Sequence, residues 1–273
     1  MRKFIITLAV LAMSAFAVNA EEKTKTYDFG DIRSLNIGYN YQVHVTEGNS
    51  DEVKVVYDSK FEGYMQISYS SETHRLSISM KDNLPKNLRV GNQPRINVYL
   101  EMDDMVKLDI SGAASVTFEG EFRSRDLDID LSGASKGSVT GNFTEEVELD
   151  LSGASKFSYT GNSNSLSTEI SGASKFTFAG DFRETDIRCS GASSAQMEGS
   201  SDSAEYECSG ASRIEAKEFV VKDLKTVLSG ASRAEVHATS SLIYSASRSC
   251  KITYYGDAVH KNISPDSNVV RGI

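Results

Sequence analysis

The chain has 273 residues and a formal net charge of −9 at pH 7, an acidity that argues against nucleic acid and anionic membrane surfaces as partners. Tryptophan is absent and proline occurs only three times, whereas Thr, Val, Ile, Tyr and Phe alternate with polar residues over long stretches. This pattern predicts a chain that is almost entirely β, long enough for one elongated domain or two compact ones.

Residues 1–20 have the composition of a secretory signal peptide. Met1–Lys3 is basic, Phe4–Val18 is apolar, and Val18-Asn19-Ala20 has the small-residue form of a signal-peptidase site. We therefore expect an exported chain that begins at Glu21, without a transmembrane segment, in the periplasm, on the cell surface or outside the cell. Loss of Arg2 and Lys3 would make its formal net charge −11.

Residues 21–105 do not follow the repeat that comes later. Short segments alternate with a period of two and are separated by polar turns such as 47–50 and 70–73, so we expect antiparallel hairpins that cap the rest of the fold. The alternating segments are 34–39, 41–45, 52–57, 65–69, 76–80 and 96–100.

Residues 106–260 repeat the phrase Ser-Gly-Ala-Ser at steps of 19 to 21 residues, and 261–273 form a C-terminal tail. So regular a period predicts one small β unit stacked on copies of itself, with corresponding residues about 4.8 Å apart. We expect a single-stranded parallel β-helix of about eight coils, right-handed by default. The repeat glycines are Gly112, Gly133, Gly153, Gly172, Gly191, Gly210 and Gly230.

The repeated phrase is interpreted as the bend of each coil. Glycine allows unusual backbone angles, and Ala and Ser are small enough for bends to stack. If side chains alternate through the bend, its second serine faces inward, and the hydroxyls bond to each other or to backbone. A catalytic role is not favoured, because the histidines share no repeat position. The inward serines are predicted to be Ser135, Ser155, Ser174, Ser193, Ser212, Ser232 and Ser247.

The chain contains three cysteines, Cys189, Cys208 and Cys250. Cys189 and Cys208 occupy the apolar place before the bend in adjacent repeats, which favours small buried hydrophobic residues. A disulfide between them is the alternative in an oxidising compartment. The odd number argues against a full disulfide framework.

Acidic residues form an outward column on the strand before each bend. Clustered carboxylates suit Ca²⁺, and the candidate ligands are Asp128, Asp130, Glu148 and Asp150. A solvated face without a metal is favoured, because no calcium-binding loop motif accompanies the acids, so no cofactor is expected. The column comprises Asp109, Asp130, Asp150, Glu169 and Glu207, flanked by Asp128, Glu148, Asp186 and Glu205.

Basic residues form a second outward column just after the bend. It could attract an acidic glycan or the acidic surface of a partner, or it could form weak exposed ion pairs with neighbouring acids. The candidate ligand-binding residues are Lys136, Lys156, Lys175, Arg213, Arg233 and Arg248, with Ser194 interrupting the column.

The order of these segments resembles the head GIN domain family, whose members are labelled auto-transporter adhesins and are common among exported proteins of Bacteroidetes. The resemblance rests on the alternating strands between Phe29 and Leu100, the Ser-Gly-Ala-Ser coils, and Tyr255-Gly256-Asp257 before the tail. It covers nearly the whole chain after residue 20. It implies an exported β-helical domain without known enzymatic activity, and it supplies no catalytic residues.

Three functions remain open on these grounds. The favoured hypothesis is a non-enzymatic exported adhesin or cell-surface protein that binds a glycan or protein ligand along its outer columns. The alternatives are a polysaccharide-degrading lyase or hydrolase, since β-helices host such enzymes, and a purely structural envelope protein. An enzyme would need a local departure from the repeat that gathers acids and a base, whereas the charges run evenly along the stack.

Overall fold

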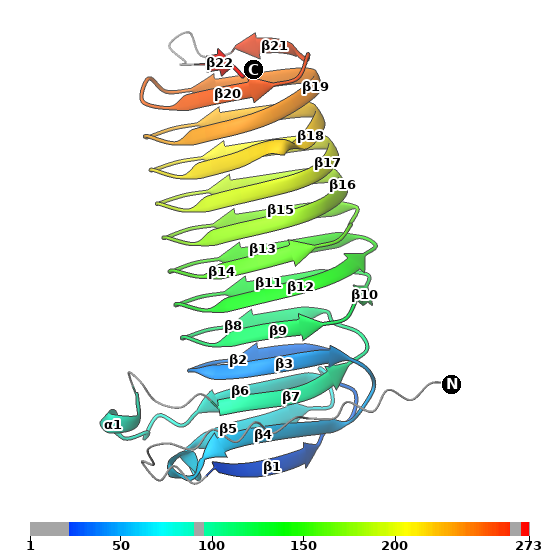
Figure 1. Cartoon of the computed structure of the whole chain (residues 1–273), viewed down its shortest axis with the longest axis vertical. Helices are drawn as coiled ribbons and strands as arrows, with labels where there is room; N and C mark the ends of the chain where they lie inside the picture. Colours follow the sequence, from blue (N-terminus) through cyan, green and yellow to red (C-terminus); the bar gives the residue numbers. More distant parts are fainter. Residues whose placement is uncertain (1–21, 90–95, 263–268, 273) are drawn as a thin grey trace, which may run out of the picture.

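The computed structural model describes residues 22–89, 96–262 and 269–272. They form a β-solenoid of about eight turns with N-terminal antiparallel strands, which confirms the predicted all-β repeat fold. Figure 1 shows the coils stacked along the long axis of the molecule, with the N-terminal strands at one end. The predicted signal peptide lies outside the described residues.

Each coil has one strand before the Ser-Gly-Ala bend, here the leading strand, and one after it, the trailing strand. Leading strands pair in parallel with leading strands of the next coil, and trailing strands with trailing strands. In β16 to β19 one strand contains the trailing segment of a coil and the leading segment of the next. The strands are β8 (Lys107–Ile110), β9 (Ser115–Glu119), β10 (Phe122–Ser124), β11 (Leu127–Leu131), β12 (Lys136–Phe143), β13 (Glu146–Leu151), β14 (Lys156–Thr160), β15 (Ser165–Ile170), β16 (Lys175–Cys189), β17 (Ser194–Cys208), β18 (Arg213–Leu228) and β19 (Arg233–Ala246).

The N-terminal region is only partly antiparallel. The pairs β1–β4, β4–β7 and β5–β6 are antiparallel, and β5–β6 is the hairpin predicted across the turn at 70–73. However, β2 lies in parallel between β6 and β8, and β3 lies in parallel between β7 and β9. These elements are β1 (Glu22–Asp28), β2 (Ser34–Ile37), β3 (Tyr41–Glu47), β4 (Glu52–Asp58), the 3₁₀ turn η1 (Ser59–Phe61), β5 (Met65–Ser70), β6 (Arg75–Met80), α1 (Lys86–Arg89) and β7 (Ile96–Met102).

The expected hairpin between β3 and β4 is therefore wrong, because both strands pair with β7 instead. The bend between β2 and β3 explains the difference. Tyr39 has a φ of +65° there, and its carbonyl accepts a hydrogen bond of 2.6 Å from the N–H of Ala113 in the first Ser-Gly-Ala bend. This segment thus has the shape of a coil without its sequence.

At the C-terminal end, β20 (Lys251–Tyr255) and β21 (Val259–Asn262) continue the two sides of the stack against β19. This pairing adds a last coil to the stack. A short strand, β22 (Val269–Arg271), then pairs in parallel with β20. Within the described ranges, no helix is long and apolar enough to cross a membrane.

The bends require glycine for two physical reasons. Their seven glycines have φ between +69° and +74°, a left-handed conformation that other residues adopt at a cost. Neighbouring bends are also hydrogen-bonded, for example from the N–H of Ala154 to the carbonyl of Gly133 at 2.7 Å. A Cβ on Gly153 would lie 2.4 Å from that same carbonyl oxygen. The predicted role of the phrase as a stacked bend is confirmed.

The predicted inward column of serines is confirmed for six of its seven members, which are at most 1% exposed. Ser247 is the exception, because it is exposed and Cys250 occupies the inward place. The last repeat is short, so its serines are shifted relative to the bend. The N–H of Ser247 donates to the carbonyl of Leu228, just as the N–H of Ser229, the first serine of the preceding bend, donates to the carbonyl of Cys208. Ser247 is therefore the first serine of its bend, not the second.

The three cysteines are buried and carry free thiols. Cys189 and Cys208 stand opposite each other on neighbouring coils, both facing the core. A hydrogen bond with Cys208 and burial raise the pKa of the Cys189 thiol. Both therefore behave as small buried residues, as favoured from the sequence.

We predict that Gly153→Ala will destabilise the solenoid far more than Gly63→Ala. Both glycines have positive φ, so each alanine incurs about 1–2 kcal/mol of backbone strain. Only at Gly153 does the new methyl group collide with backbone, whereas nothing lies within 4 Å of it at Gly63. Urea denaturation followed by circular dichroism measures the difference, and equal midpoints for the two variants would contradict a tightly stacked bend.

We also predict opposite effects for two buried serines. The hydroxyl of Ser212 donates to the carbonyls of Ser209 (2.8 Å) and Cys189 (3.3 Å), so Ser212→Ala should cost about 1 kcal/mol. The hydroxyl of Ser174 is buried without a hydrogen-bond partner among the described residues. Ser174→Ala should be neutral or stabilising, and thermal melting of both variants tests this contrast.

Candidate functional site

Stacking places outward side chains in straight columns on two faces of the solenoid. The leading face is formed by leading strands and the trailing face by trailing strands. We call the outward column nearest the bend on the leading face the acid ladder. In coil order it contains Asp109, Asp130, Asp150, Glu169, Arg188 and Glu207, and it continues as Val227 and Ser245.

The acid ladder therefore contains the five acids predicted from the sequence and one residue that the sequence analysis missed. Arg188 stands between Glu169 and Glu207, at distances of 3.9 Å and 3.6 Å from their carboxylates. It also pairs with Asp186 in the next column at 2.5 Å. A cation thus neutralises the middle of the ladder, and aligning the repeats residue by residue would have located it.

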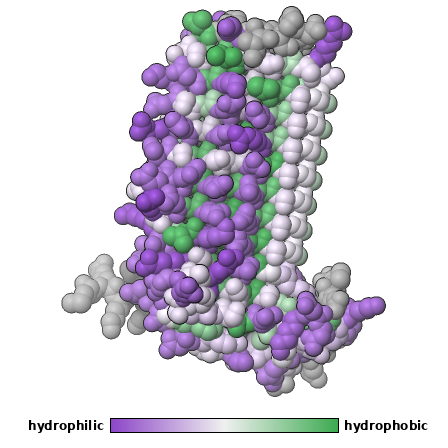
Figure 2. Space-filling view, turned by 180° about the vertical axis from the view of Figure 1, so that it is seen from behind, coloured by the Kyte–Doolittle hydropathy of each residue, from purple (hydrophilic) through white to green (hydrophobic). Residues whose placement is uncertain are grey.

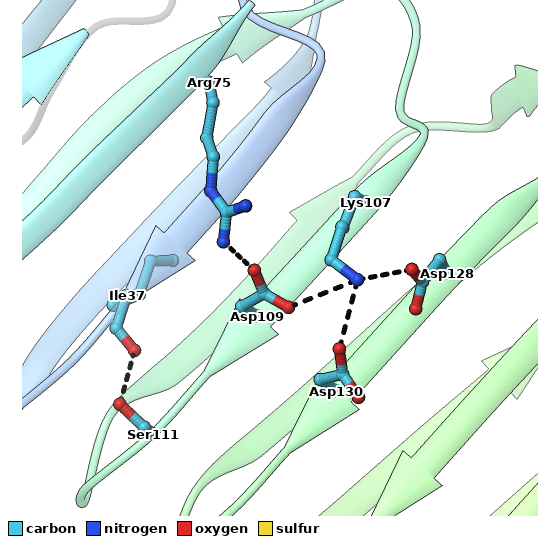
Figure 3. Close-up of polar contacts among 7 residues, drawn as sticks. All are labelled: Ile37, Arg75, Lys107, Asp109, Ser111, Asp128 and Asp130. Atoms are coloured by element: carbon cyan, nitrogen blue, oxygen red, sulfur yellow. Dashed lines mark hydrogen bonds and ion pairs between the residues drawn. The ribbon is translucent and has the colours of Figure 1, made fainter. Parts of the chain in front are cut away.

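Two further cations neutralise the N-terminal end of the ladder (Figure 3). Arg75 on β6 pairs with Asp109, and the ammonium of Lys107 contacts Asp128 and lies 3.1 Å from Asp130 and 3.6 Å from Asp109. The hydrogen bond with Asp128 contributes most to raising the pKa of Lys107. Partial burial nevertheless raises the pKa of Asp109, and its proximity to Asp130 adds to this.

The four candidate calcium ligands lie together, but Lys107 contacts two of them. Asp128 is in register with Glu148, and Asp130 with Asp150. Partial burial, followed by repulsion from neighbouring carboxylates, raises the pKa values of Glu148 and Asp150. In the described part of the chain, no group of three or more His, Cys, Asp or Glu residues is arranged to hold a metal ion.

An open groove of about 630 Å³ runs along the stack between the acid ladder and the bends. One wall consists of the ladder side chains from Asp130 to Glu207, and the other of the first serines of the bends, Ser132 to Ser229. Several of these serines donate to a carbonyl of the preceding coil, such as Ser171 to Leu151 at 3.3 Å. Figure 2 shows the bends as a straight pale column of small residues beside a surface of hydrophilic side chains.

The predicted basic column lies on the trailing face, and we call it the basic ladder. Its places are occupied in coil order by Ser115, Lys136, Lys156, Lys175, Ser194, Arg213, Arg233 and Lys251. Arg248 does not belong to it, because the short last repeat leaves Arg248 in the bend and brings Lys251 opposite Arg233.

The lysine part of the basic ladder is unlike the rest of the surface. Lys136, Lys156 and Lys175 are exposed, and none forms an ion pair with another of the described residues. Their outward neighbours on the same strands are the uncharged Ser138, Ser158 and Thr177. By contrast, Arg213 pairs with Glu215 at 3.3 Å. Three stacked, unneutralised ammonium groups make this strip the strongest candidate for binding anions.

We predict that Asp150→Asn will stabilise the protein at neutral pH and that the gain will vanish near pH 3.8, the ordinary pKa of an aspartate. Because the folded-state pKa is raised, the folded chain holds this proton more readily, so stability falls as pH rises through the folded pKa. Because solvent screens the exposed carboxylates of the acid ladder, the gain in the free energy of unfolding stays below about 1 kcal/mol.

Asp223→Asn is the matched control with the opposite sign. A hydrogen bond from Ser241 lowers the pKa of Asp223, so its charged form is favoured by folding and amide substitution should destabilise at neutral pH. Thermal melting at both pH values measures the two effects. A gain for Asp150→Asn that does not change with pH would contradict the electrostatic explanation.

Three solved structures have the same fold over 93% of this chain and 98% of their own length. Two are described as a "putative adhesin", from Parabacteroides merdae (TM-score 0.69, 14% identity) and from Parabacteroides distasonis (TM-score 0.66, 16% identity). The third is a "putative lipid binding protein" from Parabacteroides distasonis (TM-score 0.61, 13% identity). At these identities the likeness establishes the fold alone. The chain matches no curated protein sequence.

The sequence itself matches one family over most of its length. The family is described as "Putative auto-transporter adhesin, head GIN domain", and its model matches residues 31–179 and 162–258. These two ranges include the coil formed by β2 and β3, all the Ser-Gly-Ala bends and both ladders. The chain therefore belongs to the head GIN domain family, the family its repeats resemble.

Proposed function

We propose that this protein is an exported, non-enzymatic adhesin domain whose basic ladder binds an acidic glycan. The observation that carries the proposal is the strip formed by Lys136, Lys156 and Lys175, whose charges are exposed and unpaired within the described structure. Family membership supports the adhesive role in general terms. The positive charge of the lysine strip favours an anionic ligand.

Spacing favours a polymer over a small anion. The three lysines lie on strands that are about 4.8 Å apart, so they span roughly 10 Å along the solenoid. A linear glycan with repeated carboxylate or sulfate groups can contact several of them at once. Each exposed contact is weak, but contacts on one chain reinforce each other because the later ones are intramolecular.

We expect Lys156→Glu/Lys175→Glu to lower the affinity for acidic glycans about tenfold or more, since it replaces attraction by repulsion at two places. A glycan array followed by titration calorimetry with a positive glycan measures this. The control variant is Lys222→Glu/Lys261→Glu, which makes the same change in net charge away from the basic ladder. It should bind acidic glycans with the affinity of the wild-type protein. Binding should also weaken as salt is added.

Other outcomes would favour the alternatives. Equal binding to anionic lipid vesicles and acidic glycans would show that the strip recognises charge on a surface instead of a glycan. Release of new reducing ends from a bound polysaccharide would identify an enzyme. A failure to bind any acidic glycan would remove the proposal.

A further inference from the structure

The acid ladder and the basic ladder have matching charge patterns, coil by coil. Three successive coils carry an acid before the bend and a lysine after it: Asp130 with Lys136, Asp150 with Lys156, and Glu169 with Lys175. The coil with Glu207 repeats the match, because its basic residue is Arg213.

The two exceptions match as well. In the one coil of this run where the acid ladder has a cation, Arg188, the basic ladder has the uncharged Ser194. In the first coil, Asp109 is neutralised within the molecule by Arg75, and the corresponding place of the basic ladder holds the uncharged Ser115. The match ends at the last coils, where Val227 and Ser245 stand against Arg233 and Lys251.

Within one molecule the ladders do not pair. They lie on opposite sides of the bend, and no ion pair joins Lys136, Lys156 or Lys175 to the acid ladder in the described residues. Both ladders, however, border the edge of the solenoid that the bends form. A second copy that is shifted perpendicular to the faces, without rotation and without a slide along the stack, would therefore place its trailing face on the leading face of the first copy. Each ladder would then meet its counterpart in the same coil.

We propose that a second copy of this chain docks in this way, with its lysine strip lying over the acid ladder and reaching into the groove of the first copy. The inference rests on the proposed function only in using the same lysine strip as an anion-binding surface. A slide by one coil would bring Lys175 against Arg188 in one direction and Arg213 against Arg188 in the other, so the charges select one register.

Three features of the surface favour such docking. The groove beside the acid ladder is open, with about 630 Å³ for entering side chains. Glu169 and Glu207 keep 67% and 47% of their side-chain surface exposed. The bends of the matched coils, from Ser132 to Ser212, carry only Ser, Gly and Ala, so no long side chain projects from the edge between the two ladders there. The interface is heterologous and does not close, so copies add one after another into a lateral array.

Sedimentation velocity at low ionic strength tests the inference. The wild-type protein should associate in a concentration-dependent manner, and added salt should reverse it. Lys156→Glu/Lys175→Glu and Asp150→Lys/Glu169→Lys should each raise the dissociation constant about tenfold or more, because each variant opposes like charges across the interface. Thermal melting checks that both variants are folded.

Mixing the two variants provides the decisive arm. Each then offers the other a complementary ladder, so the mixture should associate although neither variant does so alone. The acid-ladder variant should still bind acidic glycans, which separates the two proposals: its glycan binding tests the proposed function and its self-association tests docking. A monomeric wild type, an associating lysine variant, or a mixture that stays monomeric would each overturn the inference.

Discussion

The fold depends on one constraint, which is the close contact between successive Ser-Gly-Ala bends. Each bend glycine is left-handed, and the carbonyl of every one except Gly230 accepts a hydrogen bond from the alanine of the next coil, for example from Ala154 to Gly133 at 2.7 Å. The contact leaves no room for a side chain. It therefore fixes the register of neighbouring coils near the bend, where outward residues lie directly beside their counterparts.

This register creates an electrostatic problem and explains how the molecule relieves it. Carboxylates at strand spacing repel each other, and partial burial on the sheet surface raises their pKa values. Lys107 and Arg75 neutralise one end of the acid ladder, and Arg188 neutralises its middle. No such partner serves Lys136, Lys156 and Lys175 in the described chain, so the lysine strip retains its attraction for external anions.

The repeat made the main features of the fold predictable, and its irregularities explain the errors. A steady period located the bends, the inward serines and both charged faces. The shortened last repeat misled the prediction at Ser247 and Arg248, because the Ser-Ala-Ser-Arg sequence at 245–248 resembles the end of the phrase but precedes the places that Cys250 and Lys251 occupy in register. The coil formed by β2 and β3 was missed because alternation alone does not distinguish parallel from antiparallel pairing. The groove could not be predicted, since it depends on the shape of the surface between two columns.

A surface of this kind gains binding strength by repetition. One coil offers a single weak, screened charge, whereas several coils offer a row whose spacing is set by the backbone and does not depend on flexible loops. The same argument applies to a glycan and to a second copy of the chain, because both meet the row with a repeated charge of their own. The repeated phrase holds the row straight, and the residues on either side of it determine which partner fits.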